Sequence, residues 1–218
     1  MKELLKNRFL IVSVAFLTFA FVTGGVYQNG SKKFSDANSA ATVLTGEKAI
    51  EKLKRRGEYD SLTAATTAAR YSVERRDGKL HAPNPANKMQ AIFDGEGNFQ
   101  LQSSRKNLAW QTDWRLKSVG YGAEQSLISP GVLHSFENRI ELRRDDIGLI
   151  EYFENQPDGL EQGFILNRKI DGANADKPLQ IVLETSGNLQ AKASADGQAV
   201  EMFDAGGAKV LSYEKLKV

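Results

Sequence analysis

The stretch LIEYFENQPDGLEQGFIL, residues 149–166, decides the fold expected for this chain. Successive side chains of a strand point to opposite faces, so the first half of the stretch has Leu149, Glu151 and Phe153 on one face and their neighbours on the other. Residues 157–159, Pro-Asp-Gly, then supply a turn, because proline fixes φ, aspartate caps the turn locally and glycine allows the exit. The stretch therefore predicts an antiparallel hairpin.

The same stretch holds carboxylates that could instead form an acid/base site. A glycosidase needs two carboxyl groups across the scissile bond, one of them with a pKa raised by burial. Glu151 and Glu161 flank the turn and could face each other, whereas alternation separates Glu151 from Glu154. We favour the plain hairpin, because the turn explains every residue that the catalytic hypothesis needs.

Strand-like alternation begins at about Met89 and continues on both sides of DGEGN, residues 94–98, which predicts another hairpin. LAWQTDWRL, residues 108–116, then places Trp110 and Trp114 on one strand face. Aromatic residues on such a face usually belong to the core. The alternative is a carbohydrate-stacking platform, in which Trp110 or Trp114 would act with Glu151 or Glu161.

Short strands separated by glycine turns continue toward the C-terminus. The turn sequences SGN, ADGQ and AGG recur at intervals of about ten residues, which is typical of an antiparallel meander in a sandwich or open barrel. The last strand pattern, KVLSYEKLKV, places Leu211 and Tyr213 on one face, with no turn or polar tail after it. We expect an exposed edge there, through which the chain self-associates or contacts a downstream domain.

A helical hairpin is expected upstream, in residues 45–76. Helix formers fill residues 46–56, Gly57 is placed to end the first helix, and Ser61 is placed to cap a second one over residues 61–74. The second helix has one face of small and apolar residues, made of Leu62, Ala65, Thr66, Ala69 and Val73. Pro83 and Pro85 are expected to break regular structure before the β region of residues 87–218.

The N-terminus carries an export pattern. Lys2, Lys6 and Arg8 precede an apolar run over residues 9–22, interrupted by Ser13 and Thr18. Residues 1–25 are thus a signal peptide, cleaved before Val26, or a retained membrane anchor, since the run is long for the first and short for the second. Residues 26–44 are polar and small, which is typical of a flexible tether.

Composition excludes several classes of function. The net charge is +2 with interleaved signs, so nucleic acid binding is not expected. The chain lacks cysteine, which excludes disulfides, thiolate metal sites and a lipoprotein anchor. DGEGN resembles the start of a calcium loop, but Phe99 and Arg105 replace its required glycine and glutamate. His81 and His134 lack a metalloprotease or triad pattern, and we expect no metal, cofactor or catalytic residue.

GEYDSLTAATTAARYSVE, GLIEYFENQPDGLEQGFIL and the ADGQAV and DAGGAKVL turns together resemble the N-terminal region of large exported bacterial surface proteins. In those proteins this region precedes FG-GAP (integrin-alpha-like) or β-propeller-type repeats. The resemblance covers residues 46–218 and implies a β-rich surface module without known catalytic residues. Because the chain stops at Val218 before any repeat, the resemblance implies a truncated product.

Together these patterns predict an exported α+β protein, mostly antiparallel β, that acts as a non-enzymatic surface or interaction module. Two alternatives remain open: a carbohydrate-binding or glycoside-active β-sandwich protein, and a structural or assembly protein tethered to the membrane through residues 1–25.

Overall fold

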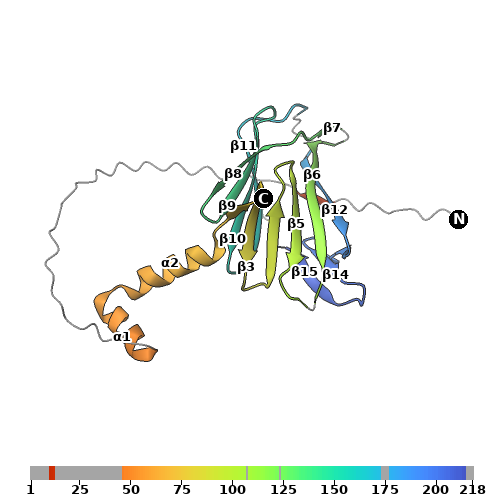
Figure 1. Cartoon of the computed structure of the whole chain (residues 1–218). Coiled ribbons are helices and arrows are strands. Elements are labelled where there is room, and N and C mark those ends of the chain that lie inside the picture. Colours follow the sequence, from red (N-terminus) through yellow and green to blue (C-terminus); the bar gives the residue numbers. More distant parts are fainter. Residues whose placement is uncertain (1–9, 13–45, 107, 123, 173–176, 215–218) are drawn as a thin grey trace, which may run out of the picture. The chain divides into compact units, whose positions relative to one another are not determined.

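The computed structural model describes residues 10–12, 46–106, 108–122, 124–172 and 177–214 (Figure 1). The chain forms two units, one of residues 17–66 and one of residues 1–16 and 67–218. The described elements are mainly antiparallel β-strands with two helices, which confirms the predicted α+β class, and the sheets do not close into a barrel.

The two predicted helices are present as α1 (Glu47–Arg56) and α2 (Tyr59–Tyr71). Gly57 ends α1 as predicted: its φ is 71°, and it is followed by a bond from the Glu58 N–H to the Leu53 carbonyl (3.0 Å). The predicted cap at Ser61 is wrong, because α2 begins at Tyr59. Ser61 therefore lies inside the first turn of α2.

The apolar face predicted for α2 lies open in the described chain. Leu62 is 52% exposed, and Ala65, Thr66 and Ala69 are exposed as well. The helix also ends at Tyr71 rather than at residue 74, because a strand begins at Glu74.

The first sheet has, in the described chain, the strand order β1-β12-β6-β5-β4-β3-β2, with β7 also paired to β6. Its strands are β1 (Leu10–Val12), β2 (Glu74–Arg76), β3 (Lys79–Asn84), β4 (Met89–Phe93), β5 (Asn98–Ser103), β6 (Gln111–Tyr121), β7 (Glu124–Leu127) and β12 (Leu179–Gly187).

The β2–β3 hairpin corrects the predicted break before residue 87. Asp77 (φ 50°) and Gly78 (φ 78°) form a two-residue turn with both φ angles positive, the geometry that Asp-Gly favours in hairpins. Pro83 lies within β3, beyond the residues that pair with β2. A proline is tolerated there because, among the described strands, that part of β3 pairs with β4 alone.

The second sheet has the order β11-β10-β9-β8 in the described chain. Its strands are β8 (Val132–Phe136), β9 (Arg139–Arg144), β10 (Leu149–Gln156) and β11 (Gly159–Leu166). The hairpin expected from residues 149–166 is confirmed, since Gln156 pairs with Gly159 across a two-residue turn. The burial of β10 alternates along the whole strand, as predicted.

The third sheet is the predicted C-terminal meander, β13 (Gln190–Ala193), β14 (Val200–Phe203) and β15 (Lys209–Tyr213). Within the described residues β15 pairs with β14 alone and is an edge strand. Leu211 and Tyr213 lie opposite Met202 and Val200, which confirms that they share a face. Self-association through this edge stays a prediction, and residues 215–218 lie outside the described chain.

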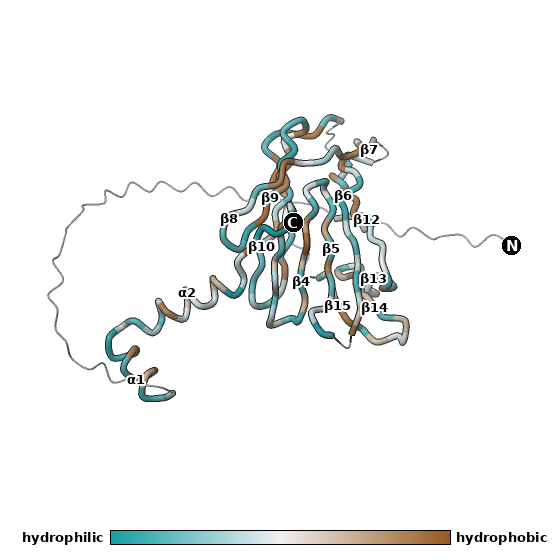
Figure 2. Tube along the Cα trace, viewed as in Figure 1, coloured by the Kyte–Doolittle hydropathy of each residue, from teal (hydrophilic) through white to brown (hydrophobic). Residues whose placement is uncertain are grey.

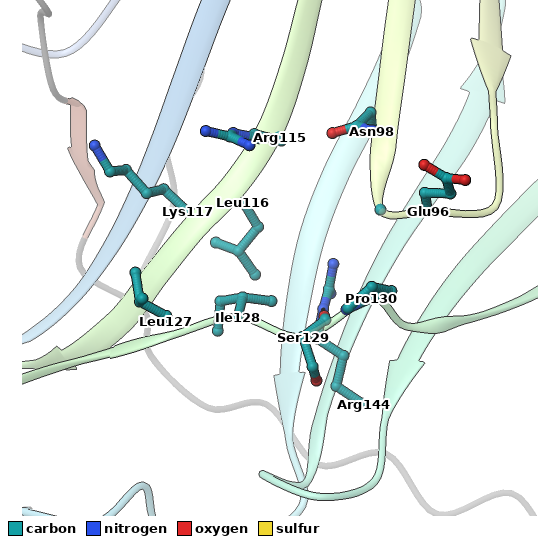
Figure 3. A pocket seen from close by; sticks show the side chains of 11 residues that line it. Glu96, Asn98, Arg115, Leu116, Lys117, Leu127, Ile128, Ser129, Pro130 and Arg144 are labelled. Carbon is teal, nitrogen blue, oxygen red and sulfur yellow. Dashed lines mark hydrogen bonds between the residues drawn. The ribbon is translucent and has the colours of Figure 1, made fainter.

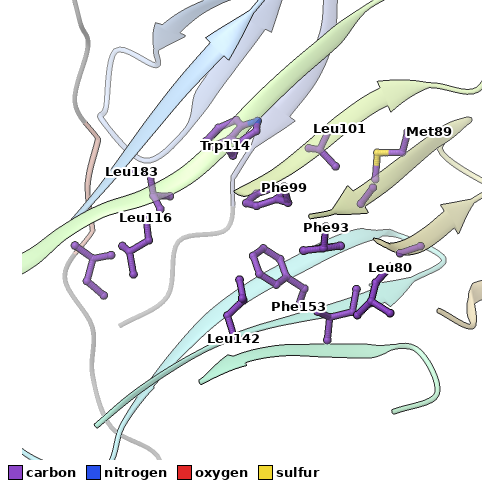
Figure 4. Packing of buried hydrophobic residues seen from close by; sticks show 14 of the residues in the cluster. Leu80, Met89, Phe93, Phe99, Leu101, Trp114, Leu116, Leu142, Phe153 and Leu183 are labelled. Atoms are coloured by element: carbon purple, nitrogen blue, oxygen red, sulfur yellow. The ribbon is translucent and has the colours of Figure 1, made fainter. Parts of the chain in front are cut away.

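The first and second sheets pack face to face through an aromatic cluster (Figure 4). The Phe153 ring of β10 lies 4.8 Å from Phe93 and 4.7 Å from Phe99, ring centre to ring centre, in edge-to-face contact. Trp114 stacks on Phe99 and also meets Tyr213 of the third sheet. Apolar residues alternate with polar ones along these strands, which lets each sheet present one apolar face to the core (Figure 2).

The predicted signal or anchor, residues 1–25, lies outside the described residues except for β1, and so does the predicted tether. Within the described residues, no helix has both the length and the apolar content needed to cross a membrane.

Candidate functional site

The unit of residues 1–16 and 67–218 contains the three sheets and is called the sheet-forming unit below. A groove of about 660 Å³ opens beside β6 in this unit (Figure 3). One side is the turn between β4 and β5, the other is the segment after β7, and β9 contributes one residue. The lining residues are Glu96, Gly97, Asn98, Arg115, Leu116, Lys117, Leu127, Ile128, Ser129, Pro130 and Arg144.

A β-bulge in β6 shapes this groove. The pairing of β12 with β6 shifts between Val182 and Leu183, whose partners Ser118 and Leu116 leave Lys117 as the extra residue. Before the bulge Trp114 and Leu116 are buried in alternation with more exposed neighbours, and after it the consecutive residues Ser118 and Val119 are both buried. The bulge therefore changes which side chains face inward just where the strand borders the groove.

Arg144 is a buried cation at the inner side of the groove, 2% exposed. Its Nη1 donates to Glu151 Oε2 (3.0 Å), and its Nε donates to the Ser129 carbonyl (3.1 Å). Gln162 donates to the other oxygen of Glu151 (2.7 Å). Burial raises the pKa of Glu151, while Arg144 and Gln162 act in the opposite direction.

The outer wall of the groove carries a more exposed set of charges. Arg115 Nε donates to Glu184 Oε2 (2.6 Å), and Lys117 Nζ lies 3.7 Å from the other Glu184 oxygen. The hydrogen bond from Arg115 holds the pKa of Glu184 below its usual range. Leu127, 82% exposed, lines the same groove (Figure 3). The groove thus offers apolar surface and positive charge together, which suits a partner with apolar and acidic groups.

The two tryptophans considered for a carbohydrate platform belong to the core. Trp110 is 6% exposed and Trp114 is 3% exposed, so neither ring offers a face on which a sugar could stack. The Trp114 Nε1–H is buried and has no hydrogen-bond partner in the described chain. These positions confirm the core interpretation and remove the basis for the platform.

The two carboxylates considered for acid/base chemistry do not face each other. Glu151 lies opposite Phe164, on the buried face of the hairpin, whereas Glu161 lies opposite Glu154 on the outer face. Glu161 there accepts a hydrogen bond from the Tyr152 hydroxyl (3.3 Å). A scissile bond could not lie between Glu151 and Glu161, because they are on opposite faces of one hairpin.

The remaining residues singled out in the sequence have structural roles. In DGEGN, Asp94 Oδ1 accepts the backbone N–H groups of Glu96 (2.8 Å) and Asn98 (3.2 Å), which closes the turn internally. A nitrogen of the His81 ring lies 2.6 Å from Gln90 Nε2, and His134 is exposed. In the described ranges, no group of three or more His, Cys, Asp or Glu side chains is placed to hold a metal.

The Arg144–Glu151 pair was missed at the sequence level, although a signal exists. Alternation in RIELRR places Arg144 on the same face as Ile140 and Leu142, which are buried. An arginine on a core face needs an acid close by, and Glu151 occupies the core face of the next strand. No family model, curated protein or solved structure matches this chain.

Proposed function

We propose that this chain is an exported, non-enzymatic interaction module of a bacterial surface protein, which binds its partner in the groove beside β6. The observation that carries the proposal is the exposure of Leu127 in a groove that Lys117 and Arg115 also line. Leu127 is 82% exposed. A partner that covers this side chain removes its apolar surface from water, which favours binding. The N-terminal export pattern and the resemblance to exported surface proteins support the same role.

Binding suits the groove better than catalysis does. Its buried charged groups, Arg144 and Glu151, bond to each other and to neighbouring polar groups, so neither is poised beside an open space to move a proton. The outer wall carries two cations, Arg115 and Lys117, that share the single carboxylate of Glu184. Such a lining attracts an acidic partner and fixes its orientation.

The groove proposal is tested by measuring binding of the full chain to a panel of peptides that combine acidic and apolar residues. We expect Leu127→Asp to reduce binding at least about tenfold, because it replaces the exposed apolar contact by a charge that repels an acidic partner. Ile165→Asp is the matched control, since Ile165 is an exposed apolar residue on β11 that does not line the groove. Equal affinities of the two variants would contradict the groove as the binding site.

Export is tested separately by fusing residues 1–44 to a reporter enzyme that is active only outside the cytoplasm of a bacterial host. We expect an active fusion, and loss of activity when Lys2, Lys6 and Arg8 are all replaced by glutamate, because the basic flank orients the apolar run. Activity that persists after this charge reversal would sink the export hypothesis. The mass of the mature protein then separates a cleaved signal from a retained anchor.

A further inference from the structure

The outer edge of β12 carries a strand from the far N-terminus of the chain. Leu10, Ile11 and Val12 of β1 pair antiparallel with Leu183, Val182 and Ile181. These three residues lie near the start of the apolar run that the sequence predicts to be an export signal or membrane anchor. A segment that is cleaved off or inserted into a membrane cannot also stay on β12, so export would uncover this edge.

The β12 edge differs from the opposite edge of the same sheet. That edge is β2, a three-residue strand of exposed charged residues, Glu74, Arg75 and Arg76, and short charged strands discourage pairing with other chains. By contrast, β12 is nine residues long and reads LQIVL over its first five residues. The β12 residues that β1 covers, Ile181, Val182 and Leu183, are uncharged, unlike the residues of β2.

The acceptor strand is also rigidly held. Ile181 is 0% exposed and Leu183 is 2% exposed, and both belong to the core between the sheets. On its inner side β12 pairs with β6 along its whole length. A fixed strand whose backbone N–H and C=O groups point outward binds an added strand without having to be ordered first.

We propose that the β12 edge is an acceptor site for an extended apolar segment of another polypeptide, which adds antiparallel opposite Ile181–Leu183 once residues 10–12 have left. The strand that pairs at this position has the sequence Leu-Ile-Val. In the intact chain β1 remains tethered, so it competes with an added strand at a high effective concentration and keeps the site closed. This acceptor site is separate from the groove and does not depend on it.

The test uses the full chain and a labelled peptide of residues 6–14, KNRFLIVSV. Leu10→Pro and Ile11→Pro are introduced together to release β1. Neighbouring residues of a strand point their N–H groups to opposite sides, so one of the two prolines must remove a donor that faces β12. The matched control, Leu10→Ala with Ile11→Ala, keeps both N–H groups.

We expect the peptide to bind the double-proline chain roughly tenfold or more tightly than the wild-type chain, whose own strand blocks the edge. A peptide with the same two prolines should not bind. Hydrogen exchange of residues 181–183 should become faster in the double-proline chain and slow again when the peptide is added. Equal peptide affinity for the wild-type and double-proline chains, or no binding to either, would overturn the proposal.

Cross-linking provides a second measurement that identifies the register. The chain contains no cysteine, so a Val182→Cys substitution in the double-proline chain introduces a single thiol. A peptide with Ile11→Cys should form a disulfide with it, because these residues are directly opposite in the observed pairing. A peptide with Val14→Cys is the off-register control. Equal cross-linking by both peptides would show non-specific contact and refute the site, and a dimer of the wild-type chain linked through exchanged β1 strands would assign the edge to a second copy instead.

Discussion

At the scale of single residues, Arg144 and Glu151 form the most deeply buried ion pair among the described residues. Both side chains are 1% exposed, and each is satisfied by the other together with Ser129 and Gln162. A buried pair of this kind adds little net stability, because removing two charges from water costs about as much as their attraction returns. Loss of one partner is costly, since it leaves the other charge buried without compensation.

Arg144→Met is therefore expected to lower the free energy of unfolding by roughly 3–5 kcal/mol at neutral pH. Burial already raises the pKa of Glu151, and loss of the arginine charge raises it further. Because the folded-state pKa then lies above the unfolded value, the folded chain holds the proton in the window between them, and stability falls as pH rises through that window. The penalty of Arg144→Met should thus be smaller near about pH 4 than at neutral pH, as measured by urea unfolding.

Arg143→Met is the control for this prediction, because Arg143 is the neighbouring arginine and its side chain is 47% exposed in its ion pair with Glu141. We expect a small effect from it at either pH. The double variant Arg144→Met with Glu151→Leu should recover most of the lost stability, since no unpaired charge remains. A penalty for Arg144→Met that does not change with pH would refute the assigned role of Glu151.

At the scale of the elements, the β10–β11 hairpin shows how strand partners decide which residues fit. Tyr152 lies directly opposite Gly163, and a Cβ at residue 163 would overlap the Tyr152 ring. Arg139 in turn covers that ring, with its guanidinium carbon 4.0 Å from the ring centre. The glycine thus makes room for an aromatic ring that packs across the outer face of the hairpin.

Gly163→Ala is expected to destabilise the chain by about 1–3 kcal/mol, because the ring must leave its position and lose its contact with Arg139. In a Tyr152→Ala background the same change should be neutral or stabilising, since alanine costs less backbone entropy in a strand than glycine does. A double-mutant cycle by thermal unfolding measures the difference. Equal effects of Gly163→Ala in both backgrounds would contradict the proposed contact.

Local patterns predicted the elements whose evidence is local. Residues 149–166 contain both the strand alternation and the turn of their hairpin, and Gly57 marks the end of α1. The predictions of this hairpin and of this helix end were therefore correct. The β2–β3 hairpin was not predicted. Pro83 and Pro85 indicate a break in regular structure, whereas the hairpin depends on the Asp77-Gly78 turn that precedes them. The groove could not be predicted, since it depends on which distant segments meet beside β6. The bulge at Lys117 depends likewise on the register with β12.

At the scale of the whole sheet-forming unit, one side chain links the three sheets. Trp114 of the first sheet stacks on Phe99, which contacts Phe153 of the second sheet, and its ring centre lies 5.5 Å from that of Tyr213 in the third. Met202 of the third sheet is also buried in the same core. Because the sheets share this core, we expect them to unfold together in a single transition.

Trp114→Ala should lower the free energy of unfolding by about 3–5 kcal/mol, the cost of a large cavity at the point where the sheets meet. Trp114→Phe is the matched control: the Trp114 N–H has no hydrogen-bond partner in the described chain, so this change keeps an aromatic ring and breaks no such bond. The cost of Trp114→Phe should be well below that of Trp114→Ala.

Trp110, which is also buried, remains as a fluorescent probe in both variants. Denaturant unfolding followed by tryptophan fluorescence and by far-ultraviolet circular dichroism should give coincident transitions for the wild type. An unfolding curve of Trp114→Ala that matches the wild type would show that the ring does not hold the sheets together. If Trp114→Phe lowered the free energy of unfolding as much as Trp114→Ala, the core would require the indole group itself rather than a ring that fills the volume.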